Sequence, residues 1–202
     1  MKGNMLVISG PSGSGKSSLM NEMIKRVDNI YFSISTTTRL KREGEIEGVN
    51  YHYISKDEFE NDIEKGFFLE WAKVHDSYYG TSLKLISKAL QNNKLVIFDI
   101  DVQGYKILKK KFGNDISSVF LTTQNRTELK FRLTKRGTDS KKTVEKRINN
   151  ALVEMAKIEE YDYLLVNENF EKTLEKLISI AISSKCKVHS FDIKEFMGMW
   201  TS

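Results

Sequence analysis

A glycine-rich stretch near the amino end, Gly10–Ser17 (GPSGSGKS), constrains the fold of this chain more than any other feature. It directly follows the apolar run Met5–Ser9 (MLVIS). After it, Leu19, Met23 and Val27 recur four residues apart, as on one face of a helix. A strand, a loop of the form G-x-x-x-x-G-K-[ST] and a helix in this order are typical of a phosphate-binding loop. Its glycines let backbone N–H groups surround phosphate oxygens, and the helix amino end adds positive potential.

Strand-like and helix-like segments alternate along most of the chain. The runs that predict strands are Met5–Ser9, Tyr31–Ser35, Leu95–Ile100, Val119–Leu121 and Tyr163–Val166. The helical patterns are Gln103–Phe112, Arg126–Lys135, Lys142–Glu160 and Glu171–Ser183. One run, Leu95–Ile100, is almost wholly apolar, as expected of a strand buried on both faces of a parallel sheet. The alternation favours an α/β fold with a doubly wound parallel sheet.

The region Thr36–Ser82 departs from this alternation, and we expect it to form an inserted lobe. Its pattern predicts a strand pair around Val49–Ile54 and Phe67–Val74, with one short helix. That helix is expected to begin in a capping box at Ser55 and to end near Gly66.

The composition bounds the function. With 202 residues, 40% of them hydrophobic, the chain can bury a core. The single cysteine, Cys186, excludes an intramolecular disulfide framework and a multi-cysteine metal site. Neither a membrane-spanning run nor a signal peptide is expected, so a cytoplasmic location is predicted. The net charge of +5 suits nucleotides as well as nucleic acid. Since Lys109–Lys111 would end a helix and face solvent, we expect no nucleic-acid partner.

Charged side chains follow the phosphate loop and the central apolar strand. Lys16 is expected to reach the transferring phosphoryl group, and the Ser17 hydroxyl can ligate Mg²⁺. Asp99 ends the strand Leu95–Phe98, where its carboxylate can face the magnesium directly or through water. Asp101 follows two residues later and would point the same way, although it would also suit the amino cap of the next helix.

Arginines, hydroxyls and one carboxylate gather in the predicted lobe. Arg39 and Arg42 could clamp a phosphate, with tyrosine hydroxyls completing its shell. Glu70 is a carboxylate in an otherwise apolar run, and it would match the adjacent N1–H and N2–H donors of guanine. Ser35 and Thr81 could donate to the guanine O6. Each residue alone also suits an ordinary surface or core role, but their joint presence beside a phosphate loop favours the functional interpretation.

Taken together, these motifs resemble those of guanylate kinases. The matching segments, in family order and spacing over roughly Met5 to Asn169, are GPSGSGKSS, SISTTTRLKREGE, GVNYHYIS, FLEWAKV, YYGT, FDIDVQG, RLTKRGT and KRINNA. The resemblance implies a single-domain P-loop NTPase fold with a five-stranded parallel sheet core (1–35, 83–135 and 148–202), an inserted mixed α/β GMP-binding lobe (36–82) and a helical lid (136–147). It also implies reversible, Mg²⁺-dependent transfer of the γ-phosphoryl group of ATP to GMP, giving ADP and GDP, in purine metabolism and GMP recycling.

The resemblance also implies a role for individual residues. Those expected to bind ATP are Gly10, Pro11, Ser12, Gly13, Ser14, Gly15, Lys16, Ser17, Ser18 and Asn167. Those expected to bind GMP are Ser35, Arg39, Arg42, Tyr51, Glu70, Tyr79, Thr81 and Asp101. The catalytic cations would be Lys16, Arg39, Arg132, Arg136 and Arg147, and the Mg²⁺ ligands Ser17 and Asp99. The chain departs mildly from the family pattern at Thr81, where serine is common, and at Leu40-Lys41, where Thr-Pro is frequent.

Some alternatives stay open at this stage. A phosphorylated acceptor is mostly dianionic at neutral pH, so no general base is needed. Accordingly, we expect His52, His75 and His189 to be surface or lobe residues. Rival functions are a non-catalytic domain that recognises phosphorylated proteins and a kinase for another nucleoside monophosphate. We expect ATP and GMP as partners, with dGMP as an open alternative, no membrane, and a monomer or homodimer. The tail Val188–Ser202 could pack on the core or support a dimer contact.

Overall fold

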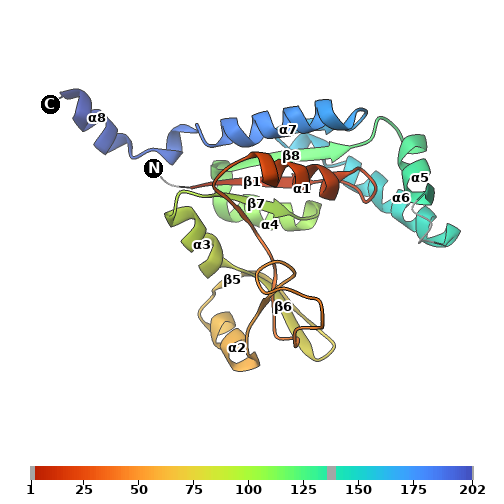
Figure 1. Ribbon diagram of the computed structural model, residues 1–202, viewed down its shortest axis with the longest axis horizontal. Coiled ribbons are helices and arrows are strands. Elements are labelled where there is room, and N and C mark those ends of the chain that lie inside the picture. Colours follow the sequence, from red (N-terminus) through yellow and green to blue (C-terminus); the bar gives the residue numbers. More distant parts are fainter. Residues whose placement is uncertain (1–2, 136–139, 202) are drawn as a thin grey trace.

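The computed structural model describes residues 3–135 and 140–201 and contains two sheets of unequal size (Figure 1). The larger sheet has five strands in the order β2-β7-β1-β8-β9, and its neighbouring strands are all parallel. They are β1 (Asn4–Ser9), β2 (Ile30–Phe32), β7 (Leu95–Asp99), β8 (Ile116–Thr122) and β9 (Tyr163–Val166). The predicted α/β fold with a five-stranded parallel sheet is confirmed.

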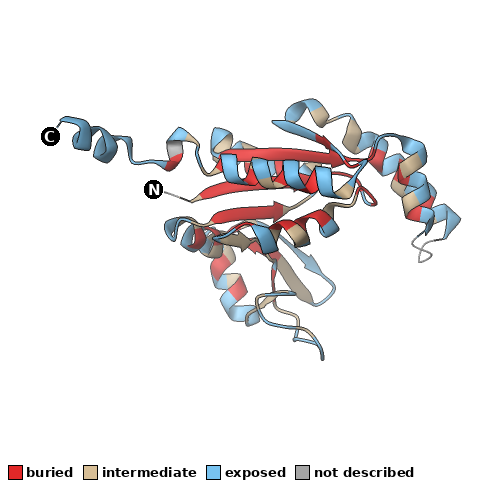
Figure 2. Cartoon of the chain, turned by 45° about the horizontal axis from the view of Figure 1, so that its top comes forward, coloured by how far each residue is buried: buried red, intermediate tan, exposed pale blue. Residues whose placement is uncertain are grey.

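Helices cover both faces of the larger sheet. Those on one face are α1 (Lys16–Arg26) and α7 (Phe170–Ser184), and those on the other are α3 (Leu83–Gln91) and α4 (Val102–Phe112). Side chains of β1 alternate between the two layers: Leu6 and Ile8 pack with α1 and α7, whereas Met5 and Val7 pack with α3 and α4. All four are buried, and β1 is buried along its whole length (Figure 2). Burying each such side chain stabilises the fold by roughly 1.5–3 kcal/mol, so the two cores hold β1 in the middle of the sheet.

The smaller sheet lies below the larger one in Figure 1 and has the order β4-β3-β6-β5. Its elements are β3 (Thr36–Thr37), β4 (His52–Tyr53), β5 (Phe68–Val74), β6 (Ser77–Ser82) and the accompanying helix α2 (Lys56–Glu64). Phe59 of α2 is fully buried, with its ring centroid 4.1 Å from that of Phe68 and 5.2 Å from that of Tyr78. As predicted, Ser55 caps α2 by accepting a hydrogen bond from Glu58 N, and Gly66 follows its end with φ of 66°.

The predicted pairing of the lobe strands is wrong. Strands β4 and β5, expected to pair, lie at opposite edges of the small sheet. Instead, β5 forms an antiparallel hairpin with β6, a strand that the sequence analysis did not predict, and His75 turns the hairpin with φ of 52°. Only His52 and Tyr53 of the predicted run Val49–Ile54 form strand β4, which pairs in parallel with β3.

Two helices beside the phosphate loop form a hairpin with a small core of its own. They are α5 (Arg126–Lys135), which matches the prediction, and α6 (Lys141–Met155). The buried side chains between them are Leu129, Leu133, Val144, Ile148 and Ala151. The helix predicted to continue to Glu160 ends at Met155, and a 3-10 turn follows at Ile158–Glu160. A second such turn, Gly113–Asp115, follows α4.

The start of the carboxyl-terminal tail is tied to the core. Lys187 Nζ donates to the carbonyl of Ile116 at 2.8 Å, and Ser190, in the 3-10 turn Val188–Ser190, hydrogen-bonds the Asn4 side chain. Beyond this point, α8 (Ile193–Thr201) projects from the body (Figure 1), and none of its residues is buried (Figure 2). Of the two predictions left open for the tail, packing of this helix on the core is therefore wrong. Within the described residues, no helix is long and apolar enough to cross a bilayer.

Candidate active site

The phosphate loop connects the end of β1 to the start of α1. Gly10 has φ of 145°, and a Cβ there would collide with the carbonyl oxygen of Leu121 on β8, so only glycine fits. Gly15 has φ of 96°, and a Cβ would collide with the Asn167 side chain. A cavity of about 210 Å³ lies at the loop and is lined by residues 11–18. The loop therefore offers an open cradle at the amino end of α1, which is the place for an anionic phosphate.

Lys16 and Asp99 meet beside this cradle. The Lys16 Nζ donates to Asp99 Oδ1 at 2.5 Å, and the two side chains are 19% and 28% exposed. Because β7 pairs with β1 in parallel, Asp99 at the end of β7 lies next to the start of the loop. The lysine is thereby held at the cradle instead of extending into solvent.

The oxygen donors at the cradle suit Mg²⁺. Besides the Asp99 carboxylate, Ser17 supplies an exposed hydroxyl in the first turn of α1. Among residues 3–135 and 140–201, no group of three or more His, Cys, Asp or Glu side chains could hold a metal ion. One carboxylate and one hydroxyl, from Asp99 and Ser17, suit Mg²⁺, because this ion keeps several waters and takes other oxygens from nucleotide phosphates.

Two of the predicted catalytic arginines, Arg132 and Arg147, contact the phosphate loop. Arg132 donates to the carbonyl of Asn167 at 2.8 Å and to that of Ser14 at 3.5 Å, and it pairs with Glu128 at 2.6 Å. The buried Asn167 side chain also donates to the Ser14 carbonyl, at 2.8 Å. Arg147 on α6 donates to Ser12 Oγ at 2.6 Å. Arg136, like the side chain of His189, lies outside what the structure describes.

In the small lobe, Arg39 is surrounded by the predicted phosphate ligands and by an acid. Its guanidinium lies 5.5 Å from the ring centroid of Tyr51, which in turn is 5.8 Å from that of Tyr79. Arg39 Nη2 also forms an ion pair of 2.7 Å with Glu45 Oε1. This hydrogen bond raises the pKa of Arg39 and is the largest of the effects that lower the pKa of Glu45 to about 2. The Arg42 side chain is exposed, and its backbone N–H donates to Glu45.

The predicted guanine ligands Glu70 and Thr81 face each other across β5 and β6. Thr81 Oγ1 donates to Glu70 Oε1 at 3.4 Å. The register between these strands shifts between Phe68 and Trp71, so Leu69 and Glu70 together oppose Thr81. Such bulges re-aim side chains beside binding sites. Ser35 is exposed just before β3, and its carbonyl accepts from His52 N at 2.9 Å.

A comparison with known families identifies the group to which the chain belongs. The guanylate kinase family model matches residues 2–184. The chain belongs to the guanylate kinase family. Guanylate kinase from Campylobacter jejuni strain RM1221 is 49% identical, covering 99% of this chain and 98% of that protein. A guanylate kinase from Helicobacter pylori is 50% identical, covering 98% and 95%. The crystal structure of guanylate kinase from Anaplasma phagocytophilum gives a TM-score of 0.66 at 28% identity, covering 93% and 88%.

One predicted ligand of this guanylate kinase family member also has a structural role. Asp101 caps the amino end of α4, where its carboxylate accepts from Gln103 N at 3.0 Å and from Gly104 N at 2.9 Å. The alternative interpretation of Asp101 as a helix cap is therefore correct, and any contact with guanine would be made by a carboxylate already held in place.

Sequence reasoning missed two acids near the site. Glu45 had no assigned role, although two acids, Glu43 and Glu45, closely follow Arg42 and were a usable signal. Glu154, half-buried on α6, lies near Lys16 and Asp101. Burial raises the pKa of Glu154, and the like charge of Asp101 raises this pKa further.

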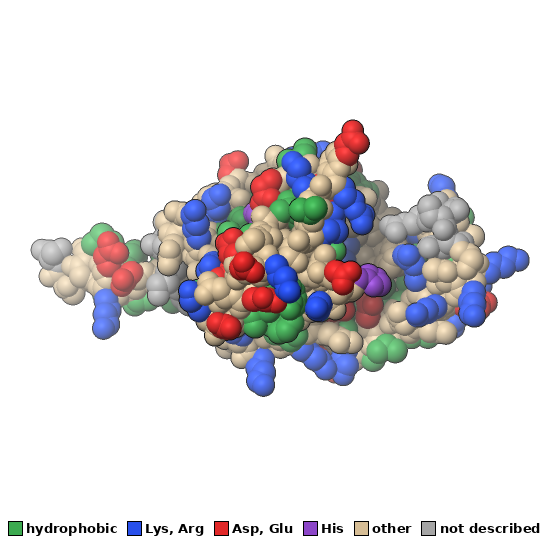
Figure 3. All heavy atoms as spheres, turned by 90° about the horizontal axis from the view of Figure 1, so that it is seen from below, with side chains coloured by type: hydrophobic (Ala, Val, Ile, Leu, Met, Phe, Trp, Pro, Cys, Tyr) green, Lys and Arg blue, Asp and Glu red, His purple; other side chains and the backbone are tan. Residues whose placement is uncertain are grey.

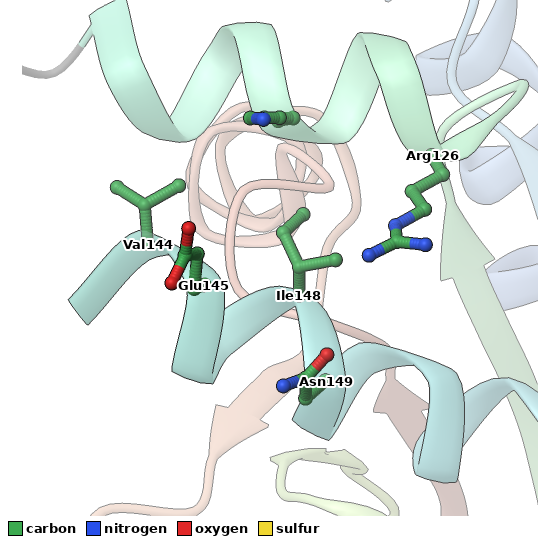
Figure 4. A pocket seen from close by; sticks show the side chains of 6 residues that line it. Arg126, Val144, Glu145, Ile148 and Asn149 are labelled. Atoms are coloured by element: carbon green, nitrogen blue, oxygen red, sulfur yellow. The ribbon is translucent and has the colours of Figure 1, made fainter. Parts of the chain in front are cut away.

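A separate cavity of about 230 Å³ lies between α5 and α6 (Figure 4). It is lined by Arg126, Lys130, Val144, Glu145, Ile148 and Asn149, none of which was predicted as a site residue. The cavity is the open side of the helical hairpin.

Proposed function

We propose that this chain is an ATP:GMP phosphotransferase that moves the γ-phosphoryl group of ATP to GMP and releases ADP and GDP. One observation supports the proposal: two separate arrangements suited to binding a phosphate lie in one molecule. The phosphate loop with Lys16 lies on the core, whereas Arg39, Tyr51 and Tyr79 lie on the lobe. A reaction between two phosphates needs such a pair of sites, one for the donor and one for the acceptor. ATP and GMP are cytoplasmic nucleotides, so we place the enzyme in the cytoplasm.

The donor site is assigned to the loop and its neighbours. Backbone N–H groups of the loop would hold the ATP phosphates, and Lys16, oriented by Asp99, would stabilise charge on the transferring group. Arg132 and Arg147 already touch the loop, at Ser14 and Ser12, so both are placed to contact phosphates there. With Arg136, these two would neutralise charge between donor and acceptor.

Mg²⁺ is assigned to Ser17 and Asp99, both of which offer oxygen donors at the loop. When bound with ATP, the ion would neutralise negative charge on the phosphate oxygens. Asp99 uses one carboxylate oxygen for Lys16, so its other oxygen remains for the shell of the ion.

The acceptor site is assigned to the lobe. Arg39, Arg42, Tyr51 and Tyr79 would hold the GMP phosphate, and Glu70 with Thr81 would recognise guanine. The second pKa of a phosphate monoester is about 6, so the acceptor is mostly a dianion at neutral pH and needs no general base. Alignment and charge neutralisation must then supply the catalysis. Water competes as an acceptor, so the lobe and the lid should close only over both substrates.

The face of the molecule that includes the lobe is consistent with small anionic substrates. Lys and Arg side chains lie among Asp and Glu side chains on the face shown in Figure 3, which includes the lobe. A mixed surface of this kind differs from the single-sign stripe typical of nucleic-acid binding. We propose no nucleic-acid partner for the enzyme.

The testing experiment is a coupled assay of ADP release with ATP and Mg²⁺, in which GMP, dGMP, AMP, CMP and UMP are offered in parallel. Turnover with GMP, with or without dGMP, and with none of the other acceptors is the expected result. Turnover with AMP or a pyrimidine nucleotide would support the assignment of kinase activity but overturn the assignment of Glu70 as the guanine ligand. Binding of GMP or a phosphopeptide without any turnover would overturn the enzyme in favour of a non-catalytic recognition domain.

A further inference from the structure

Glu45 lies among the lobe residues that we propose to bind the acceptor phosphate, Arg39, Arg42, Tyr51 and Tyr79. One carboxylate oxygen, Oε1, accepts from Arg39 Nη2 at 2.7 Å. The other, Oε2, accepts from the Arg42 backbone N–H and from the Tyr53 hydroxyl, each at 2.8 Å. One acid thus ties together the segment that carries both arginines and a strand residue of β4.

The guanidinium of Arg39 is fixed from several sides. Besides its ion pair with Glu45, its Nη1 donates to the Leu40 carbonyl at 2.8 Å. Its central carbon lies 5.5 Å and 5.9 Å from the ring centroids of Tyr51 and Tyr53. The Arg39 and Glu45 side chains are only 16% and 18% exposed. A guanidinium has five N–H donors, so donors remain for a phosphate after these contacts are made.

Fixing this side chain before the ligand arrives has a direct consequence for binding. Ordering a long, flexible side chain during association costs conformational entropy. An arginine already ordered in the folded lobe avoids that cost when a phosphate binds. The contacts of Glu45 therefore favour binding of a phosphate by Arg39.

The charge of Glu45 acts in the opposite direction. Its pKa is well below neutral, so it is an anion at physiological pH and repels an incoming phosphate. Orientation and repulsion thus predict opposite signs for its removal. If repulsion dominated, the uncharged variant would bind a phosphate more tightly; if orientation dominated, it would bind more weakly.

We propose that Glu45 is a positioning residue for the acceptor phosphate: it holds Arg39 in its phosphate-binding orientation, and this effect outweighs its own repulsion. The inference rests on the proposed function, because it assigns the acceptor to the lobe. It adds to that function a residue that would act through Arg39 without touching the substrate.

The test compares Glu45→Gln with a matched control, Glu43→Gln, which removes the same charge from an exposed position two residues away. Binding of GMP and of guanosine is measured by calorimetry on the full chain, and thermal unfolding checks the fold. Without the charged partner, Arg39 would have to be ordered by the phosphate itself, so we expect GMP affinity to fall roughly tenfold in Glu45→Gln. Guanosine lacks the phosphate, so its affinity should change less than twofold. Glu43→Gln should match the wild type for both ligands.

A second variant, Tyr53→Phe, tests whether a smaller disturbance of Glu45 gives a smaller loss of GMP affinity. Tyr53→Phe removes one donor to Glu45 but no charge, so GMP affinity should fall in the same direction by roughly two- to fivefold. In steady-state assays, KM for GMP should rise in both variants while KM for ATP stays within twofold.

Each contrary result has a distinct meaning. Unchanged or tighter GMP binding by Glu45→Gln would overturn the positioning role and leave the kinase intact. An equal loss of guanosine and GMP binding would show that Glu45 only supports the lobe, which also overturns the proposal. A wild-type chain that bound neither ligand would overturn the proposed function and, with it, the role of Glu45.

Discussion

Asp99 accepts a 2.5 Å hydrogen bond from Lys16 Nζ, although 83 residues separate the two positions. The contact follows from the topology, because β1 and β7 are parallel neighbours and both end at the same edge of the sheet. A buried or half-buried carboxylate beside a lysine directs the ammonium group, so the loop lysine has one defined position before a nucleotide arrives.

We expect Asp99→Asn to lower kcat by roughly 100-fold while KM for GMP changes less than threefold. An amide can still accept from Lys16, but it no longer offers the negative charge that balances the lysine and attracts a cation. Steady-state kinetics at varied Mg²⁺ concentration provide the measurement. The Mg²⁺ concentration that gives half-maximal rate should also rise.

Lys16→Ala serves as the reference for that experiment and should remove nearly all turnover. An Asp99→Asn enzyme with wild-type kcat and an unchanged Mg²⁺ requirement would contradict the role given to the carboxylate.

Glu70→Gln should reduce kcat/KM for GMP by roughly 10- to 200-fold and leave KM for ATP within twofold. The oxygen of a glutamine amide can accept from only one of the two guanine donors, N1–H and N2–H, and its NH2 group faces the other, so one donor loses its partner at a cost of about 1–3 kcal/mol. Parallel assays with GMP and AMP measure the selectivity. The control is Glu64→Gln, an exposed acid at the end of α2. Equal GMP kinetics in Glu70→Gln and the control would exclude Glu70 as the guanine ligand.

The elements that the sequence predicted well are those with a strong local signal. The phosphate loop carries a motif, and the buried strand β7 is a continuous apolar run, so each signal is independent of distant residues. Strand β6 (SYYGTS) has no such signal, because it is a strand only through its pairing with β5 and β3. The pairing of the lobe strands was wrong for the same reason. Helix α3 was missed although Leu83, Ile86 and Ala89 recur three apart, because no turn residue separates it from β6.

The site was predictable in its residue types but not in its internal contacts. Motif spacing pointed to Arg39 and Asp99, and each lies where a phosphate or a cation could be met. It did not show that Glu45 anchors Arg39, since that contact depends on how residues 39–45 fold back on themselves. Nor could it decide whether Asp101 caps α4. Side-chain partners of this kind depend on tertiary geometry that one sequence does not encode in any short pattern.

The lowered pKa of Glu45 predicts a contribution to stability that depends on pH. Hydrogen bonding to Arg39, and then to Arg42 N, lowers this pKa from 4.5 to about 2. The charged form is therefore favoured in the folded state, and the stabilisation is fully present above about pH 5. It should be lost as the pH falls from 4.5 to 2, where the carboxyl becomes protonated in both states. Thermal unfolding of the wild type and Glu45→Gln across pH 2–7 measures the effect.

The expected outcome is a difference in Tm between the two proteins that is constant from pH 5 to 7 and shrinks steadily below pH 4.5. Glu43→Gln provides the baseline for removal of an exposed acid. A difference that grew on acidification would mean that the folded state raises the pKa of Glu45, contrary to the geometry.

Phe59→Ala should separate the stability of the lobe from that of the core. Phe59 is fully buried between Phe68 and Tyr78, and removing a buried phenylalanine costs roughly 3–5 kcal/mol. Since its contacts lie in the small lobe, the loss should appear as faster hydrogen exchange in α2, β5 and β6. Exchange in β1, β7 and β8 should stay at the wild-type rate. KM for GMP should rise, whereas binding of ATP to the phosphate loop should not change.

Phe67→Ala, at a partly exposed neighbouring position, is the control and should leave both regions unaffected. Equal acceleration of exchange in both sheets would instead mean that lobe and core unfold as one cooperative unit.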